Sequence, residues 1–232
     1  GSQYRLADGS RPAIAPPNLE PVLQATTQLA AQHAGLLVEP KRASVALHYR
    51  LAPHLEDLCR DTMRGSSVIG NSIWDSHNRW LTIHGTDYLV ARDNVGYRSI
   101  GHGYFLEDGT EVLNVLDRNL AVQSFKARPL PKQALPFDPN DGAGFWWANG
   151  RNVLTRNVAC ENDEYGYRFE IAKRSNFNPS LNVRQPDGSR DVRDVRRIPF
   201  LRFEDNESHS EGLYSFNFGD DVNGAVARVS MN

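Results

Sequence analysis

The sequence is poor in cysteine, in long apolar runs and in net charge. Its two cysteines, Cys59 and Cys160, are far apart and lack a metal-binding or redox spacing, which fits a reducing compartment. Lysine and arginine number 26 and aspartate and glutamate 28, so the formal net charge is −2 and no basic face for nucleic acid is indicated. No apolar run approaches the roughly 20 residues of a membrane span. We therefore expect neither a nucleic-acid partner nor a membrane segment.

Turn-forming residues are abundant instead. The 232 residues include 18 glycines and 13 prolines but only 2 methionines, which argues against a helical bundle. Hydrophobic residues make up 40% and charged residues 23%, as in globular proteins of one large or two small domains. The chain opens with Gly1 and Ser2, without Met or a signal peptide. We expect a soluble processed product, internal fragment or recombinant chain, of unassigned compartment.

The first 63 residues have the pattern of a small α/β unit. Apolar residues recur at helical spacing from Leu19 to His33, and Asn18 stands where an N-cap is expected. Two strands and a second helix are expected at residues 36–39, 43–50 and 54–63.

From Gly65 onward, short apolar stretches are separated by Gly, Asn and Asp. One asparagine recurs in a local pattern, at Asn71, Asn94, Asn119, Asn157 and Asn206. The intervals from 71 to 94 and from 94 to 119 are 23 and 25 residues, the length of one coil of a parallel β-solenoid. The longer intervals require insertions, at residues 126–141 and 177–197. Because stacked coils place equivalent residues above one another, we expect an asparagine ladder.

Each coil is expected to hold one strand some distance after its asparagine and another just before the next asparagine. The first kind covers residues 80–84, 103–107, 144–148 and 166–170, and the second kind 88–91, 112–116 and 152–155. A last coil is expected near residues 211–218.

Three segments near the N-terminus resemble the cap subdomain of trehalose-phosphate phosphatases, of the haloacid-dehalogenase superfamily. They are GSQYRLADG at residues 1–9, LVEPK at 37–41 and SVALHYRLAP at 44–53. The resemblance implies that Glu39 and Lys41 match substrate-contacting positions of that family. The Asp-x-Asp-Gly-Thr nucleophile motif and the rest of the catalytic core are absent, which argues against phosphatase activity.

The second part resembles the right-handed parallel β-helix of G8-domain proteins, which include cell-surface hyaluronidases and fibrocystin-like proteins. The resemblance rests on IHG at residues 83–85, NVGY at 94–97, GHGYFLEDG at 101–109, NLA at 119–121, ND at 140–141, FWWAN at 145–149 and YGY at 165–167. It implies a mainly β fold, a truncated right-handed parallel β-helix of about five coils over residues 64–232. The family's G8 module, its upstream coils and a Phe-Pro-x-His-Phe-His segment are missing.

Together the two resemblances predict a chimera of two fragments, joined near Met63, whose origin is natural or engineered. A β-helix cut open exposes unpaired strand edges, and solenoids need caps for solubility. We therefore expect residues 1–63 to cap the solenoid end, and exposed ends to allow a homo-oligomer.

Strand alternation assigns the outward faces of the predicted coils. His84, Glu107, Ala148 and Glu170 form one expected outer column, and Thr82, Phe105, Trp146 and Arg168 form its neighbour, with His102 beside them. The functional interpretation is a shallow saccharide site. Its catalytic residues would be His84, Glu107, His102 and Glu170, and its substrate-binding residues Phe105, Trp146 and Arg168. The structural interpretation is a solvated polar face.

Several chemistries suit these residue types. Carboxylates act as acid and base in glycosidic cleavage, or bind a cation that acidifies a sugar carbon. His84, His102 and Glu107 offer instead the ligands of a divalent metal, the one cofactor that the sequence suggests. Three functions stay open: binding or cleavage of an acidic polysaccharide of the hyaluronan type, which follows from the resemblance only; a folded recombinant without native activity; and a metal-dependent hydrolase.

Overall fold

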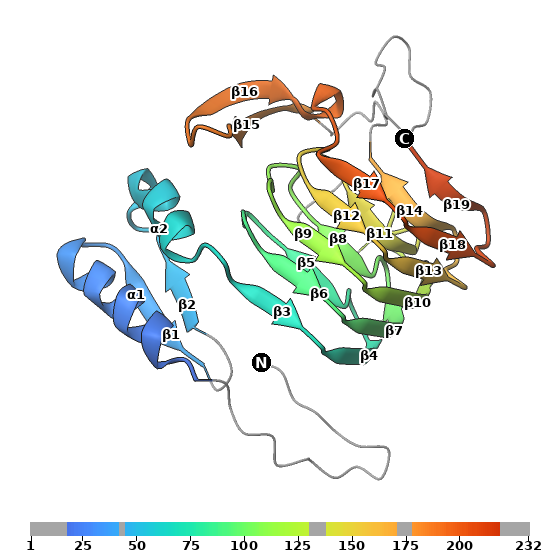
Figure 1. The fold of residues 1–232 in the computed structure, drawn as a ribbon, viewed down its shortest axis with the longest axis horizontal. Coiled ribbons are helices and arrows are strands. Elements are labelled where there is room, and N and C mark those ends of the chain that lie inside the picture. Colours follow the sequence, from blue (N-terminus) through green and yellow to red (C-terminus); the bar gives the residue numbers. More distant parts are fainter. Residues whose placement is uncertain (1–17, 42–44, 130–137, 171–177, 219–232) are drawn as a thin grey trace. The chain divides into compact units, whose positions relative to one another are not determined.

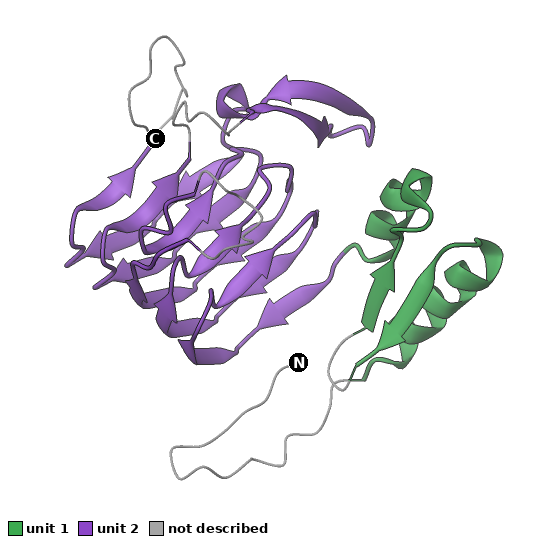
Figure 2. Cartoon of the chain, turned by 180° about the vertical axis from the view of Figure 1, so that it is seen from behind, with its two compact units in different colours: residues 1–64 green, residues 65–232 purple. Residues whose placement is uncertain are grey.

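The computed structural model describes residues 18–41, 45–129, 138–170 and 178–218. The chain divides into two compact units, residues 1–64 and 65–232, which we call the first unit and the β-helix unit (Figure 2). No helix in the described ranges is long and apolar enough to cross a membrane.

The first unit contains two helices and a hairpin, as the sequence predicts. Helix α1 (Glu20–Gln32) precedes the antiparallel strands β1 (Leu37–Pro40) and β2 (Val45–His48), and a 3₁₀ turn (Pro53–Leu55) leads into α2 (Glu56–Thr62). The side-chain oxygen of Asn18 accepts a hydrogen bond from the Glu20 N–H at 3.1 Å, which satisfies one free donor at the start of α1.

The β-helix unit consists of three parallel sheets of five strands each (Figure 1). The first sheet contains β3 (Ser67–Ile69), β6 (Val90–Arg92), β9 (Val115–Asp117), β12 (Val153–Thr155) and β17 (Arg202–Glu204). The second contains β4 (Ser72–Ser76), β7 (Val95–Ile100), β10 (Leu120–Phe125), β13 (Val158–Cys160) and β18 (Glu207–His209). The third contains β5 (Leu81–Ile83), β8 (Tyr104–Leu106), β11 (Ala143–Trp147), β14 (Tyr165–Phe169) and β19 (Tyr214–Asn217).

This arrangement is the expected parallel β-helix, with one difference. The first and third sheets correspond to the predicted strands, but the second sheet, which directly follows the asparagines, was not predicted. Its inward positions hold small residues such as Gly96, Ala121 and Ala159, while larger side chains such as Trp74 and Tyr97 face outward. The alternation is therefore opposite to that of a half-buried strand.

An asparagine ladder forms the corner between the first and second sheets. The residue before each ladder asparagine has a positive φ between 52° and 67°, which turns the chain sharply. Asn94 Nδ2 donates to Asn119 Oδ1 at 2.8 Å, and Asn119 Nδ2 donates to Asn157 Oδ1 at 2.9 Å. All three are at most 1% exposed, so these bonds satisfy amides that water cannot reach. The predicted ladder is confirmed.

An aromatic stack runs through the core beside the third sheet. Tyr104, Phe145, Tyr167 and Phe216 occupy equivalent inward positions on successive strands. Their ring centroids are 4.9, 4.8 and 5.0 Å apart and the rings lie within 11° of parallel. Parallel strands thus repeat one side-chain contact from coil to coil, which stabilises the unit by buried apolar area and ring stacking.

The two predicted insertions interrupt the coils. Part of the expected 177–197 insertion is an antiparallel hairpin of β15 (Ser180–Arg184) and β16 (Arg190–Asp194), and Val183 packs in a cluster with Val112, Val195 and Ile198. The 126–141 insertion falls partly outside the described residues, and its described end brings Asp138 back against the third sheet.

Candidate functional site

Two clusters of titratable side chains lie along the third sheet. Strand β5 pairs in parallel with β8, with Ile83 opposite Leu106, so the residues that follow the two strands meet at one edge. We call His84, Glu107 and Asp108 the outer cluster. His102, Asp138, Asp141 and Arg79 form the second group, which we call the buried cluster.

The outer cluster places one imidazole between two carboxylates. His84 Nδ1 lies 3.1 Å from Glu107 Oε2 and 2.9 Å from Asp108 Oδ2. The His84 side chain is 66% exposed, Asp108 29% and Glu107 19%, so solvent reaches the group. Burial raises the pKa of Glu107, and the Asp108 charge adds to this while His84 opposes it. A carboxyl with a raised pKa beside a second carboxylate is a suitable proton donor.

A third acid, Glu111, contacts the backbone of this cluster. It is fully buried, and its Oε1 accepts hydrogen bonds from the backbone N–H groups of Gly85 at 3.0 Å and Asp108 at 3.1 Å. Burial, followed by the charge of Asp108, raises its pKa to about 8. Glu111 therefore joins the segments that carry His84 and Asp108. Sequence reasoning missed it, because no spacing signal marks this residue.

The buried cluster is a network of hydrogen bonds around His102, which is 0% exposed. The Ala143 N–H donates to His102 Nδ1 at 3.1 Å, so the ring proton sits on Nε2, which donates to Asp138 Oδ1 at 2.9 Å. Arg79 Nη2 lies 3.1 Å from Asp138 Oδ2. Burial alone would raise the pKa of Asp138, but His102 and Arg79 together hold it below its ordinary value.

Most of the predicted outer columns are not on the surface. Phe105, Trp146, Arg168 and Glu170 are at most 2% exposed, and the expectation that they face solvent is wrong. The Arg79 guanidinium lies 4.2 Å above the Phe105 ring, whose centroid is 4.8 Å from that of Trp146. Because Phe105 and Trp146 are both buried, neither ring has a free face on which a sugar could stack.

The strand register aligns Phe105, Trp146 and Arg168 as the predicted column requires, so the burial of this face, and not the alternation, differs from the prediction. Arg168 Nη2 lies 3.4 Å from Glu170 Oε2, and both side chains are 1% exposed. His102 is likewise buried, so of the predicted catalytic residues only His84 and Glu107 reach solvent.

The predicted metal group of His84, His102 and Glu107 does not assemble. His102 belongs to the buried cluster, where both of its ring nitrogens are engaged and Arg79 already supplies a positive charge. The outer cluster offers one nitrogen and two carboxylate oxygens within 4.8 Å of one another, a ligand set that suits several divalent ions. A metal there stays a prediction.

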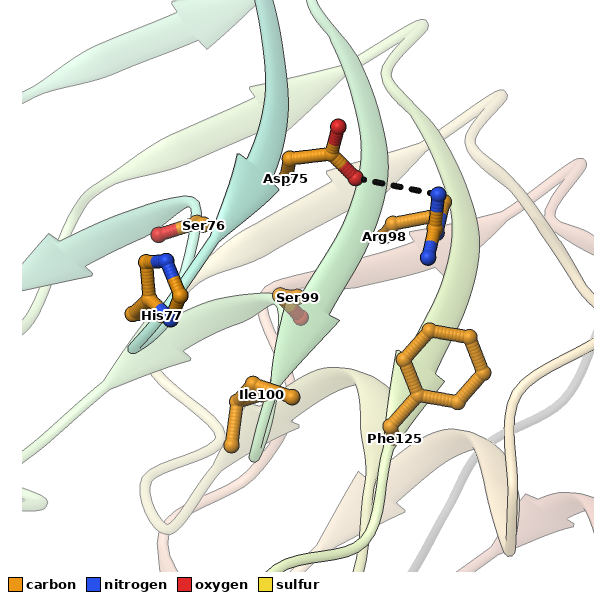
Figure 3. Close-up of a pocket in the computed structure, with 7 residues that line it drawn as sticks. All are labelled: Asp75, Ser76, His77, Arg98, Ser99, Ile100 and Phe125. Carbon is orange, nitrogen blue, oxygen red and sulfur yellow. Dashed lines mark ion pairs between the residues drawn. The ribbon is translucent and has the colours of Figure 1, made fainter.

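A separate pocket lies on the outward face of the second sheet (Figure 3). It has a volume of about 330 Å³, and its lining includes Asp75, His77, Arg98, Ile100 and Phe125. Arg98 Nη1 lies 3.3 Å from Asp75 Oδ1. Sequence reasoning missed this pocket because it missed the sheet that builds it.

Comparison with known proteins identifies the family. A family model described as the CEMIP β-helix matches residues 42–216, three quarters of the chain. The chain belongs to this family. The resemblance of the second part to hyaluronidase-like β-helices is thereby confirmed.

Three relatives show how much of this chain, and how much of each relative, the similarity covers. Fibrocystin-L of Mus musculus is 31% identical over 159 residues, 68% of this chain and 3% of the relative. The cell migration-inducing and hyaluronan-binding protein of Mus musculus is 30% identical over 158 residues, 60% of this chain and 11% of the relative. The cell surface hyaluronidase CEMIP2 of Homo sapiens is 31% identical over 130 residues, which are 46% of this chain and 9% of the relative. The chain thus spans at most 11% of these proteins.

The family match also bears on the first unit. It begins at residue 42, inside the segment that resembles the phosphatase cap, and continues across the boundary at residue 64. The phosphatase resemblance of residues 1–63 and a join near Met63 stay predictions.

Proposed function

We propose that the β-helix unit binds an acidic polysaccharide of the hyaluronan type and cleaves it at the outer cluster. The observation that carries the proposal is the contact of His84 with two solvent-reachable carboxylates, at 3.1 and 2.9 Å. The polymer class is supported by the relatives, which include a hyaluronan-binding protein and a cell surface hyaluronidase.

The two carboxyl groups differ in the way that glycoside hydrolysis requires. Glu107 is the less exposed and has the raised pKa, so it donates the proton to the leaving glycosidic oxygen. Asp108 is the more exposed and attacks the anomeric carbon. The oxygens of the cluster lie within 4.8 Å of one another, a separation that favours direct attack by a carboxylate over attack by an interposed water. Water, deprotonated by Glu107, then releases the sugar from Asp108.

Direct measurement of hyaluronan chain length tests this proposal. We expect the wild-type chain to shorten labelled hyaluronan, with the rate at least tenfold lower for His84→Ala and about a hundredfold lower for Glu107→Gln. His54→Ala and Glu20→Gln, at exposed positions of the first unit, are matched controls and should leave the rate unchanged. Equal shortening by Glu107→Gln and wild type, or no shortening at all, contradicts cleavage at this cluster.

A metal-dependent hydrolase is the second candidate, because the same cluster offers a nitrogen and two oxygens at metal-ligand spacing. Chelation by EDTA distinguishes the two. Shortening that survives EDTA supports the acid–base proposal, whereas shortening that EDTA abolishes and a divalent ion restores supports the metal. If hyaluronan is not shortened and neither EDTA nor a divalent ion has an effect, the chain is a folded recombinant without native activity.

We also propose that residues 1–63 derive from a phosphatase cap and that the chain is a chimera. The sequence motifs of that segment and the unit boundary at residue 64 support this. The start of the family match at residue 42 argues against a join at Met63. Sequencing the source nucleic acid across codon 63 tests it, and one uninterrupted natural reading frame would contradict a recombinant origin.

A further inference from the structure

We propose that the outward face of the second sheet carries a subsite for a uronate sugar, formed by Trp74, Tyr97 and Arg98. The class of polymer rests on the function proposed above, but the subsite lies on a different sheet from the outer cluster. Its evidence is independent of the cleavage chemistry.

The two aromatic residues are side by side and open to solvent. Trp74 pairs with Tyr97 in the parallel register of β4 and β7, so both side chains project from the same face of adjacent strands. Trp74 is 49% exposed and Tyr97 43%. Val95 and Ile100, on the same strand as Tyr97, are each 39% exposed, so these two strands carry four exposed apolar side chains.

Charged groups adjoin this surface at the bend of the same strands. Asp75 and Arg98 both have a positive φ, 49° and 57°, a conformation that residues other than glycine adopt at a cost. Their side chains are 49% and 50% exposed and share one contact of 3.3 Å. An exposed ion pair of this kind contributes little to stability, so Arg98 can exchange Asp75 for a ligand carboxylate without a large penalty.

The pocket beside Arg98 has the size and lining for one ring substituent. Its volume is about 330 Å³, and Ile100 and Phe125 supply apolar walls while His77 and Asp75 supply polar ones (Figure 3). A cavity that mixes apolar walls with a few polar groups is typical of small-molecule and sugar sites.

These features together select an acidic sugar. The C–H face of a pyranose ring packs against an exposed aromatic ring, and a guanidinium binds a carboxylate through paired, charge-assisted hydrogen bonds. Asp75 accepts hydrogen bonds from sugar hydroxyls. One arginine and one histidine match the single carboxylate of a uronate, whereas a heavily sulfated chain would require a larger basic patch.

Titration of hyaluronan oligosaccharides into the full chain carrying Glu107→Gln tests the subsite, because we expect this variant to cleave about a hundredfold more slowly than the wild type and so to leave the oligosaccharides intact during the titration. We expect Arg98→Gln and Trp74→Ala each to weaken binding about tenfold, since each variant loses one direct contact to the sugar. Arg193→Gln, at an arginine that is 57% exposed and paired with Asp191, and Tyr214→Ala, at a tyrosine that is 54% exposed, are the matched controls and should bind within twofold of the parent. Circular dichroism verifies that each variant folds.

Three results would overturn the subsite. They are unchanged binding in Arg98→Gln and Trp74→Ala, equal binding of neutral dextran, and sedimentation showing a dimer that Trp74→Ala dissociates, since a second copy would then cover the face. These outcomes can be distinguished from a failure of the cleavage proposal. Binding that depends on Arg98, in a chain that cleaves no hyaluronan, retains the subsite and removes the catalytic cluster.

Discussion

The β-helix unit and the first unit differ in where their stabilising contacts come from. In the β-helix unit, each ladder asparagine bonds to its counterpart one coil away, and the aromatic stack repeats the same contact. In the first unit, the contacts are those of two helices and one hairpin, and among its described residues only Thr26, Ala52, Cys59 and Arg60 are buried. The comparison teaches that repetition, and not local propensity, orders most of this chain.

Removal of residues 1–63 is the change for which we expect the largest effect, a loss of solubility of the β-helix unit. Strands β3, β4 and β5 are the edge strands of their sheets, and an unprotected edge invites aggregation. We expect the 64–232 fragment to be insoluble when expressed under the conditions that give soluble full-length chain. A fragment that is soluble and unfolds cooperatively would show that the β-helix unit needs no cap.

Loss of one ladder side chain tests the repetition itself. Asn119 donates to the Ala91 carbonyl and to Asn157 Oδ1, and its own Oδ1 accepts from Asn94. Asn119→Ala leaves buried partners unsatisfied, so we expect a loss of ~3 kcal/mol in the free energy of unfolding, measured in urea. A loss below ~1 kcal/mol would mean that the ladder contributes little.

The two units also differ in the direction in which their surroundings shift the pKa of a carboxyl group. Glu111 has a pKa of about 8 in the folded chain against an ordinary 4.5, so between these pH values the folded chain holds a proton that the unfolded chain releases. Stability should therefore fall as pH rises, by ~1 kcal/mol per pH unit. Glu111→Gln, which is neutral at every pH, should flatten this dependence in urea titrations at pH 6 and 7.

Glu39 of the first unit provides the control for that measurement. It is exposed, and a hydrogen bond from His48, together with Lys41, lowers its pKa. Glu39→Gln should leave the pH dependence between pH 6 and 7 as it is in the wild type. If Glu111→Gln and wild type show the same slope, Glu111 is ionised in the folded chain.

The smallest expected effect concerns the start of helix α1 in the first unit, where Leu19 and not the predicted Asn18 is the N-cap. The Asn18 side chain bonds one N–H at the start of α1, so Asn18→Ala should cost ~0.5–1 kcal/mol. The effect should appear in the unfolding of the first unit alone, followed by the helical signal in circular dichroism. An effect as large as that of Asn119→Ala would contradict the contrast between local and repeated contacts.

Sequence reasoning reached the features that repeat or that are local. The period of the asparagines predicts the ladder, and local signals predict α1 and the β1–β2 hairpin. It missed the second sheet, whose large side chains, such as Trp74, face outward.

The candidate site was predictable only in part. The meeting of His84 and Glu107 follows from strand register. The burial of Phe105 and His102 depends on Arg79 and on Asp138, which comes back after an insertion, and no strand pattern encodes such long-range contacts.

The central claim is that Glu107 acts as an acid beside Asp108, and the appearance of new reducing ends in hyaluronan as a function of pH tests it most directly. Because only protonated Glu107 can donate, the wild-type rate should be highest at acidic pH and decline as pH rises through the raised pKa of this residue. Glu107→Gln should release reducing ends about a hundredfold more slowly than the wild type and without this decline with pH. Release by Glu107→Gln with the wild-type pH profile would contradict the account.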